Sequence, residues 1–260
     1  MIFEMRDVSF SYDGHTPIIQ DISLRMERPG LYCIVGPNGV GKSTLVKCMN
    51  RILTPTSGEV LIDGRDIASM GSKEISERIG YVPVSSEISF SVPILDAILL
   101  GRHNKSRWRT TERDIEMSNR AMETMGISDL AMRSCSELSA GQQQKVNLAR
   151  GMVQETEMLI LDEPTANLDV KHQVYVSELL RALAVQEGMI IVMISHDLNI
   201  AAKYSHEVIV MSKPGVIYSM GTPKEVFTEK MIMDVYDIGC RVIEDNGRPH
   251  MMWGSINTLW

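Results

Sequence analysis

The stretch at residues 36–43, GPNGVGKS, decides the fold. It follows a near-continuous apolar run at residues 31–35 and precedes a segment with helical spacing at residues 44–53. Glycines let the backbone curl tightly, so that successive N–H groups point inward and form a nest for phosphate oxygens. A helix that follows adds the positive end of its dipole. The pattern therefore predicts a strand, a phosphate-binding loop and a helix in succession.

The residues of this loop have distinct expected roles. The Lys42 ammonium is expected to reach the β- and γ-phosphates of a nucleotide, and the Ser43 hydroxyl is expected to ligate Mg²⁺. A glycine-rich turn with a chance lysine is the alternative, but it does not explain the flanking strand and helix. The expected nucleotide contacts are Gly36, Pro37, Asn38, Gly39, Val40, Gly41, Lys42, Ser43 and Thr44.

Two acids follow a second apolar run. Residues 158–161 read MLIL, and Asp162 and Glu163 come directly after them. Ligands of parallel sheets bind at the carboxyl ends of the strands, so Asp162 is placed to hold Mg²⁺ directly or through water. Glu163 could polarise an attacking water. Two acids after a strand also open many ordinary loops, but the phosphate loop favours catalysis, since hydrolysis of a nucleoside triphosphate needs both parts.

Composition and charge limit the class of protein. The 260 residues are 44% hydrophobic and 23% charged, which suits one large domain or one domain with an insertion. The net charge of −7 argues against nucleic acid as the main partner, because duplex binding relies on cationic patches. One basic run, residues 102–109, is either a solvated surface turn or a contact with an acidic partner.

The cysteines and the start of the chain indicate a compartment. Cys33, Cys48, Cys135 and Cys240 form no closely spaced pair, so the sequence favours reduced thiols and a cytoplasmic setting. The N-terminus lacks the basic start and apolar run of a signal peptide. No apolar stretch approaches the roughly 18 residues that span a bilayer. We therefore expect a protein that does not enter a membrane by itself.

Hydrophobic periodicity divides the chain into distinct segments. Residues 8–12 and 22–26 alternate as strands, whereas residues 94–153 have helical spacing that includes Ile115. We predict an α/β fold with a P-loop NTPase core of mainly parallel sheet and helices, an N-terminal antiparallel β subdomain and an inserted α-helical subdomain. The expected boundaries are 1–85 and 154–220 for the core with its β subdomain, 86–153 for the helical subdomain, and 221–260 for a C-terminal tail.

A third motif, LSAGQ at residues 138–142, lies shortly before Asp162 and would alone suggest an ordinary helix cap. Together with the phosphate loop and LDEP at residues 161–164, it resembles the signature of the ATP-binding cassette (ABC) ATPases. The usual signature has glycine where this chain has Ala140. Further pieces that resemble the family are Tyr12, which matches its adenine-stacking aromatic residue, Asn167-Leu168-Asp169, which resembles its D-loop, and Ser195-His196-Asp197, which resembles its switch-histidine loop.

The resemblance implies a mechanism and partners. Two subunits would pair head to tail around two ATP molecules, so that the signature of one caps the γ-phosphate held by Lys42 of the other. His196 would contact that phosphate, and transmembrane permease subunits would hold the homodimer peripherally at the cytoplasmic face of the cell membrane. No nucleic acid is expected. The implied signature contacts are Ser139, Ala140, Gly141 and Gln142, the D-loop residue is Asp169, and the Mg²⁺ ligands are Ser43 and Asp162.

Segments between the motifs resemble one group within the family. Residues 50–67, residues 92–102 and the tail look like cassettes of importers for iron chelates, haem and cobalamin. ATP hydrolysis would then power import, with cargo specificity in the permease and its capture protein. A soluble cassette ATPase of repair, translation or cofactor assembly is the alternative, and the single cassette and net charge of −7 favour transport. Glu163 and His196 disfavour a purely structural nucleotide binder.

One position departs clearly from the family pattern. Tyr-Val-Pro at residues 81–83 matches the start of its Q-loop, where a glutamine normally reaches Mg²⁺ and the attacking water and links the ATP site to the helical insertion. This chain has Val84, which has no donor or acceptor. Ser85, Ser86 or Glu87 would substitute only if the loop shifts. Our hypothesis is that Ser43 and Asp162 mainly hold Mg²⁺, and that coupling through this loop is weakened or rewired.

Overall fold

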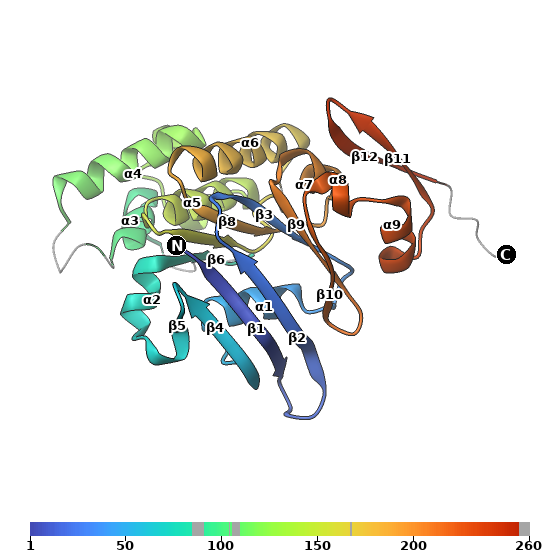
Figure 1. The fold of residues 1–260 in the computed structure, drawn as a ribbon. Helices are drawn as coiled ribbons and strands as arrows, with labels where there is room; N and C mark the ends of the chain where they lie inside the picture. The colour runs from blue at the N-terminus through green and yellow to red at the C-terminus, as the bar shows by residue number, and fades with distance from the viewer. Residues whose placement is uncertain (85–90, 104, 106–109, 167, 255–260) are drawn as a thin grey trace. The chain divides into compact units, whose positions relative to one another are not determined.

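The computed structural model describes residues 1–84, 91–103, 105, 110–166 and 168–254. Figure 1 shows the helices and strands along the chain, which forms two compact units. Met1–Met70 and Ser177–Trp260 make up the first unit, and Gly71–Val176 makes up the second. The first unit is therefore built from both ends of the sequence.

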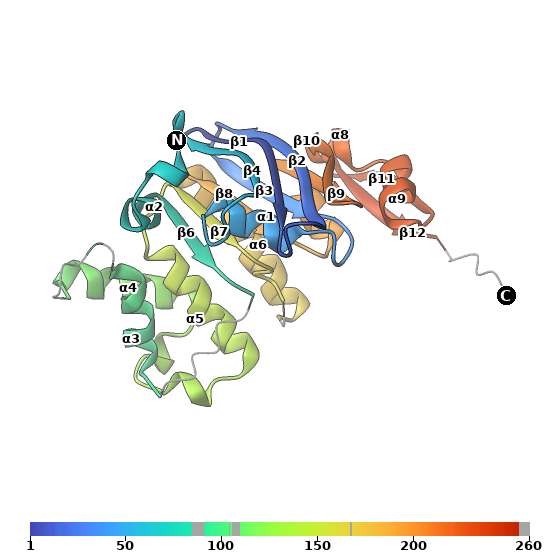
Figure 2. The ribbon, with the colours of Figure 1, turned by 90° about the horizontal axis from the view of Figure 1, so that it is seen from below.

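An antiparallel sheet in the first unit comes from the N-terminal segment. Its strand order is β2-β1-β4-β5, and β1, β2 and β4 lie side by side (Figure 2). In β2, Ile22, Leu24 and Met26 are buried and alternate with exposed residues, because successive side chains of a strand point to opposite faces. The predicted N-terminal antiparallel strands are thus present. The strands are β1 (Phe3–Ser11), β2 (Pro17–Met26), β4 (Ser57–Ile62) and β5 (Arg65–Asp66).

Parallel strands in the first unit carry the phosphate loop. Strand β3 pairs in parallel with β8 and β9, and β10 is antiparallel to β9. All residues of β3 and β8 are buried, which explains their continuous apolar sequence. Helix α1 follows β3 and α7 follows β8, as in an α/β fold. The bounds are β3 (Gly30–Val35), α1 (Lys42–Met49), β8 (Ile190–Ile194), α7 (Leu198–Tyr204), β9 (Glu207–Ser212) and β10 (Val216–Gly221).

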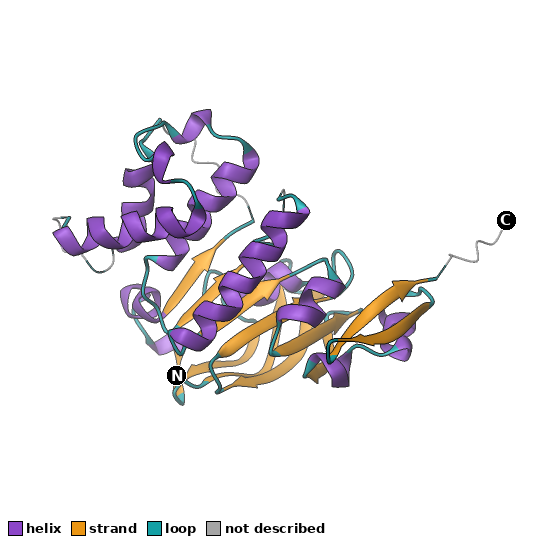
Figure 3. Ribbon diagram, turned by 90° about the horizontal axis from the view of Figure 1, so that it is seen from above, coloured by secondary structure: helices purple, strands orange, loops and turns teal. Residues whose placement is uncertain are grey.

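The segment that the sequence suggested only as a tail has its own secondary structure. Its last two strands form an antiparallel hairpin (Figure 3). The turn between them contains Asn246 and Gly247, with φ of 49° and 76°, as two left-handed residues favour. The hairpin is fixed to α7, because the Asn199 amide donates to the Met251 carbonyl over 3.2 Å and accepts from its N–H over 2.8 Å. The elements are α8 (Pro223–Val226), α9 (Glu229–Tyr236), β11 (Cys240–Asp245) and β12 (Arg248–Trp253).

The second unit is mainly helical, with one pair of parallel strands, β6 and β7. Helices α3, α4 and α5 pack against one another. Within the ranges that the structure describes, no helix has the length and apolar character needed to cross a bilayer. The elements are α2 (Ser72–Arg78), β6 (Ile79–Val82), α3 (Ile94–Leu99), α4 (Glu112–Met125), α5 (Ala140–Met152), β7 (Met158–Leu161) and α6 (Val170–Gln186), which continues into the first unit. Short 3₁₀ turns are η1 (Ile67–Ser69) in the first unit and η2 (Leu100–Arg102), η3 (Ser128–Leu130) and η4 (Cys135–Glu137) in the second.

Helix α4 corrects one detail of the predicted apolar face. Ile115 is 41% exposed, whereas its neighbour Asp114 is buried. Asp114 completes a capping box with Thr111, and its Oδ1 accepts from the Arg102 guanidinium over 2.8 Å. The start of α4 therefore turns an acid inward and Ile115 outward.

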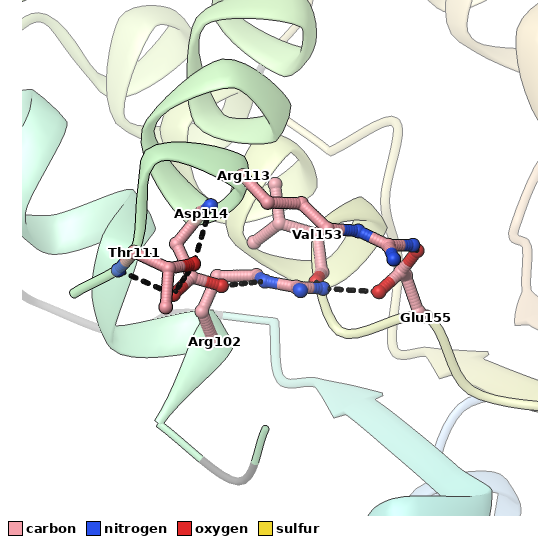
Figure 4. Close-up of polar contacts among 6 residues, drawn as sticks. All are labelled: Arg102, Thr111, Arg113, Asp114, Val153 and Glu155. Atoms are coloured by element: carbon pink, nitrogen blue, oxygen red, sulfur yellow. Dashed lines mark hydrogen bonds and ion pairs between the residues drawn. The ribbon is translucent and has the colours of Figure 1, made fainter. Parts of the chain in front are cut away.

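The buried Arg102 is the centre of this polar network (Figure 4). Its guanidinium also donates to the Val153 carbonyl at the end of α5 and to the Glu155 carboxylate, over 2.8 and 2.5 Å. Burial alone would raise the pKa of Asp114, but hydrogen bonds from Thr111 and the charge of Arg102 outweigh it and lower the pKa to about 2. The first residue of the basic run 102–109 is thus part of the interior.

Candidate nucleotide site

The phosphate loop connects the buried strand β3 to helix α1. Two of its glycines are required by close approach of the backbone. Gly36 has a φ of 154°, and a Cβ there would lie 2.5 Å from the Met211 carbonyl oxygen. Gly41 has a φ of 102°, and a Cβ there would lie 2.9 Å from the Ile18 carbonyl oxygen. The spacing of glycines in the sequence therefore follows from where the loop meets its neighbours.

The loop and the helix end have the chemistry of an anion site. The Lys42 ammonium is buried and donates to the carbonyl oxygens of Gly36 and Pro37, over 2.8 and 2.9 Å. The N-cap of α1 is Gly41, which has no side chain to cap the first-turn N–H groups, and that turn contains no acid. Backbone N–H groups at a helix N-terminus suit phosphate oxygens. The residues present thus fit the triphosphate of ATP.

Tyr12 lies close to the same helix. Its hydroxyl is 3.4 Å from the Thr44 hydroxyl oxygen, so two of the predicted nucleotide contacts meet. The Tyr12 ring is 63% exposed and packs its edge against Phe10, with ring centroids 4.9 Å apart. An exposed ring held from one side is suited to stacking with a flat base.

His196 follows strand β8, beside the strand that leads into the phosphate loop. The Ser195 N–H donates to the Ile34 carbonyl over 3.1 Å, which places the end of β8 next to the end of β3. On the other side Asp197 caps α7 by accepting from the Asn199 N–H over 2.8 Å. The exposed His196 is therefore fixed between a strand end and a helix cap, at the edge where the phosphate loop begins.

Asp162 and Glu163 lie in the second unit, at the carboxyl end of β7. The Asp162 N–H donates to the Val82 carbonyl over 2.9 Å, and its side chain is buried. Burial, together with the charge of Asp162, raises the pKa of Tyr81 to about 12. Glu163 has a φ of 52°, a left-handed conformation that costs about 1–3 kcal/mol in a residue with a side chain. The catalytic role of Glu163 stays a prediction.

The signature sequence forms the N-terminus of α5. Ser139 is the N-cap, and its N–H donates to the Gln142 side-chain oxygen over 3.0 Å. The Gln142 N–H donates in return to the Ser139 hydroxyl oxygen over 3.3 Å. This capping box leaves Ala140 exposed at the first helical position. The helix-cap interpretation of LSAGQ is therefore confirmed, and the role of the motif as a signature stays a prediction.

The remaining predicted residues are divided between the units. Ser43 belongs to the first unit and Asp162 to the second, so their shared Mg²⁺ site stays a prediction. Oxygen ligands of this kind suit Mg²⁺. Among the residues described, no group of three or more His, Cys, Asp or Glu side chains is arranged to hold a metal. Asp169 accepts from the His172 N–H over 2.8 Å at the start of α6.

Val84 stands two residues beyond the end of β6 and is half-buried. The possible substitutes Ser85, Ser86 and Glu87 lie outside the described residues, as does Asn167 of the predicted D-loop. Val84 therefore lies just beyond the carboxyl end of β6, which pairs with β7, the strand that precedes Asp162. The role of the loop after Val84 stays a prediction.

Comparison with known proteins settles the family. The sequence profile described as "ABC transporter" matches residues 19–166. The chain belongs to the ABC transporter family. It is 34% identical to the petrobactin import ATP-binding protein FpuD of Bacillus anthracis, over 93% of this chain and 89% of that protein. It is 38% identical to the cobalamin import ATP-binding protein BtuD of Halobacterium salinarum, over 85% of this chain and 56% of that protein, so it spans about half the length of that relative.

The fold comparison agrees. An inward-facing structure of a putative metal-chelate type ABC transporter superimposes with a TM-score of 0.81, covering 96% of both chains at 22% identity. At that identity the likeness supports the fold alone, and it confirms the predicted α/β class. ABC ATP-binding proteins are ATPases, and the resemblance to importers of iron chelates and cobalamin is confirmed by the relatives.

The sequence of this ABC chain gave no indication of two contacts, which are made by Gln144 and Tyr236. Gln144 reaches from α5 to the loop after Glu163, a contact 20 positions apart that no local pattern indicates. Tyr236 comes from α9, in the segment expected to be a tail. Burial raises the pKa of Tyr236, and Cys33 adds a smaller upward contribution. The backbone of Gly36 lowers the same pKa through a hydrogen bond, so the Tyr236 hydroxyl lies beside the first residue of the phosphate loop.

Proposed function

We propose that this ABC protein is the ATP-hydrolysing subunit of an importer whose cargo is an iron chelate, haem or a cobalamin-like molecule. The observation that carries the proposal is the N-terminus of α1, where the N-cap is Gly41 and the first turn holds no acid, with the buried Lys42 beside it and the exposed Tyr12 close by. The import ATP-binding proteins of petrobactin and cobalamin among the relatives support the cargo class.

Each predicted residue has a definite task in this reaction. Tyr12 stacks on the adenine, and the loop N–H groups with Lys42 bind the phosphates. Mg²⁺, when bound through Ser43 and Asp162, neutralises charge on the phosphate oxygens. Glu163 takes a proton from the attacking water, and His196 contacts the γ-phosphate. Positioning and electrostatics supply most of the rate in phosphoryl transfer, which fits the fixed backbone on both sides of His196.

Assembly follows from the position of the signature. Ser139 and Gly141 at the start of α5 present a helix N-terminus, which would cap the γ-phosphate bound to a second copy of the chain. Two ATP molecules are then enclosed in a head-to-tail homodimer, and hydrolysis opens it. Permease subunits would convert this closing and opening into transport at the cytoplasmic face of the membrane. With Val84 at the Q-loop position, coupling to the permease would be weakened or rewired.

The test uses Glu163→Gln, which keeps the size of the side chain but removes the base. ATP turnover should fall about a hundredfold or more, and the variant should run as a dimer in size-exclusion chromatography with ATP and Mg²⁺. Lys42→Ala is the matched control and should give neither turnover nor dimer, because nucleotide binding is lost. Glu163→Gln with normal turnover would remove Glu163 from catalysis.

Transport itself is tested by reconstitution with a candidate permease in vesicles. Cargo should stimulate ATP hydrolysis by the wild-type protein and leave Lys42→Ala inactive. A protein that sediments with ribosomes or DNA, and never with membranes, would refute the transport proposal.

A further inference from the structure

The side-chain amide of Gln144 joins helix α5 to the loop that carries Glu163. Gln144 is buried, only 4% exposed, and its Nε2 donates to the Pro164 carbonyl oxygen over 3.0 Å. The adjacent Gln143 donates instead to the Leu138 carbonyl, just before the same helix, over 3.3 Å. Of these two neighbouring glutamines, Gln144 is therefore the one that contacts the loop containing Glu163.

The backbone of the loop explains why such a contact is needed. Glu163 is left-handed and directly precedes Pro164, whose ring restricts it further. Pro164 has no N–H, so its carbonyl is its one backbone hydrogen-bonding group, and Gln144 satisfies it. The next carbonyl, that of Thr165, accepts from the Gln173 side chain over 3.4 Å. Strained residues persist only where the surroundings fix them, and these side-chain amides supply that restraint.

The same helix carries the signature. Ser139 and Gln142 form its capping box, and Gln144 lies on the next turn. A turn of α-helix is stiff, since its backbone hydrogen bonds link successive turns, so a shift of the signature end moves Gln144 with it. The contact with Pro164 then transmits that shift to Glu163.

We propose that Gln144 is a positioning residue for ATP hydrolysis. It holds the Glu163 loop in its left-handed conformation and links it to the signature helix of the same subunit. A phosphate captured by Ser139 at one nucleotide site thereby sets the direction of the Glu163 carboxylate at the other. The inference rests on the proposed role of Glu163 as the base.

The experiment compares Gln144→Met, which keeps the volume but removes the donor, with Gln143→Met as the matched control on the same helix. For Gln144→Met, kcat should fall about five- to tenfold, as expected for one lost hydrogen bond to a buried carbonyl, while KM for ATP stays within about twofold. Gln143→Met should keep kcat within about twofold of wild type, because its amide does not reach the loop.

A second measurement separates positioning from support of the helix. In the Glu163→Gln background, ATP-driven dimer formation should be equal with and without Gln144→Met. Loss of the dimer, a rise in KM that matches the fall in kcat, or an unchanged kcat would each overturn the inference. If Gln144→Met does not fold, Gln144→Asn, whose amide stops one methylene short of Pro164, is judged by the same criteria. A wild-type protein without ATPase activity would instead refute the proposed function.

Discussion

Replacing Arg102 with methionine should open the helical part of the second unit. The Arg102 side chain is 5% exposed and bonds three partners from two segments, namely Asp114 at the start of α4, and Val153 and Glu155 at and just beyond the end of α5. Methionine fills a similar volume, so the cavity term is small. What is lost is the charge and its donors, and Asp114 is left as a buried carboxylate without its cation.

The magnitude follows from the network. The pKa of Asp114 falls from its ordinary value of 3.8 to about 2. At about 1.36 kcal/mol per unit, that shift is worth roughly 2 kcal/mol, shared between Thr111 and Arg102. Removing one partner of a buried ion pair costs about 3–5 kcal/mol, because the other charge stays buried. Since Thr111 remains, we expect about 3 kcal/mol, or roughly a hundredfold in the equilibrium for local opening.

Hydrogen exchange followed by mass spectrometry measures this opening directly, because local unfolding can be resolved for peptides from α4 and α5. The matched control is Arg113→Met. Arg113 contacts the same Glu155 over 3.1 Å, but its side chain is 72% exposed, so it should cost below about 1 kcal/mol. Adding Asp114→Asn to Arg102→Met should recover part of the loss. Equal effects of Arg102→Met and Arg113→Met would refute the reasoning.

Two further predictions concern acid and the Q-loop position. Because the folded pKa of Asp114 is depressed, its contribution to stability is present above about pH 4 and is lost as the pH falls through about 2. Unfolding followed by circular dichroism should therefore show no loss of stability from this group between about pH 7 and 5, and progressive loss below about pH 4. Thr111→Val should weaken the contribution, and a pH-independent stability would contradict it. Val84→Gln should raise Mg²⁺-dependent turnover or its stimulation by permease in a phosphate-release assay, whereas no change in either would count against the weakened-coupling hypothesis.

Features fixed by neighbouring residues could be predicted from the sequence. The phosphate loop depends on glycine spacing and on the apolar run before it, so the strand, the loop and the helix could all be predicted. Strand β7 could be predicted in the same way, from the apolar run that precedes Asp162 and Glu163. The LSAGQ motif is likewise local, because its capping box spans four residues. Such short-range requirements of the backbone restrict which residue types can stand at neighbouring positions, so they can be recognised in the sequence.

Features fixed by distant partners could not be predicted. Ile115 was expected to face the interior, but burial of Asp114 against Arg102 turns it outward. Gln144 meets Pro164 only because two segments fold together. The left-handed backbone of Glu163 also has no sequence signal, since glutamate seldom adopts it without outside support.

The capping box separates what folding and assembly each require at position 140. Ser139 and Gln142 satisfy each other's backbone N–H groups across the first turn of α5, so the cap does not depend on the side chain of residue 140. Ala140 is exposed there, and alanine favours a helix over glycine by about 1 kcal/mol. The free subunit would tolerate many residues at this place. In the proposed dimer the same surface would meet a second copy, so a small residue at position 140 would serve assembly rather than folding.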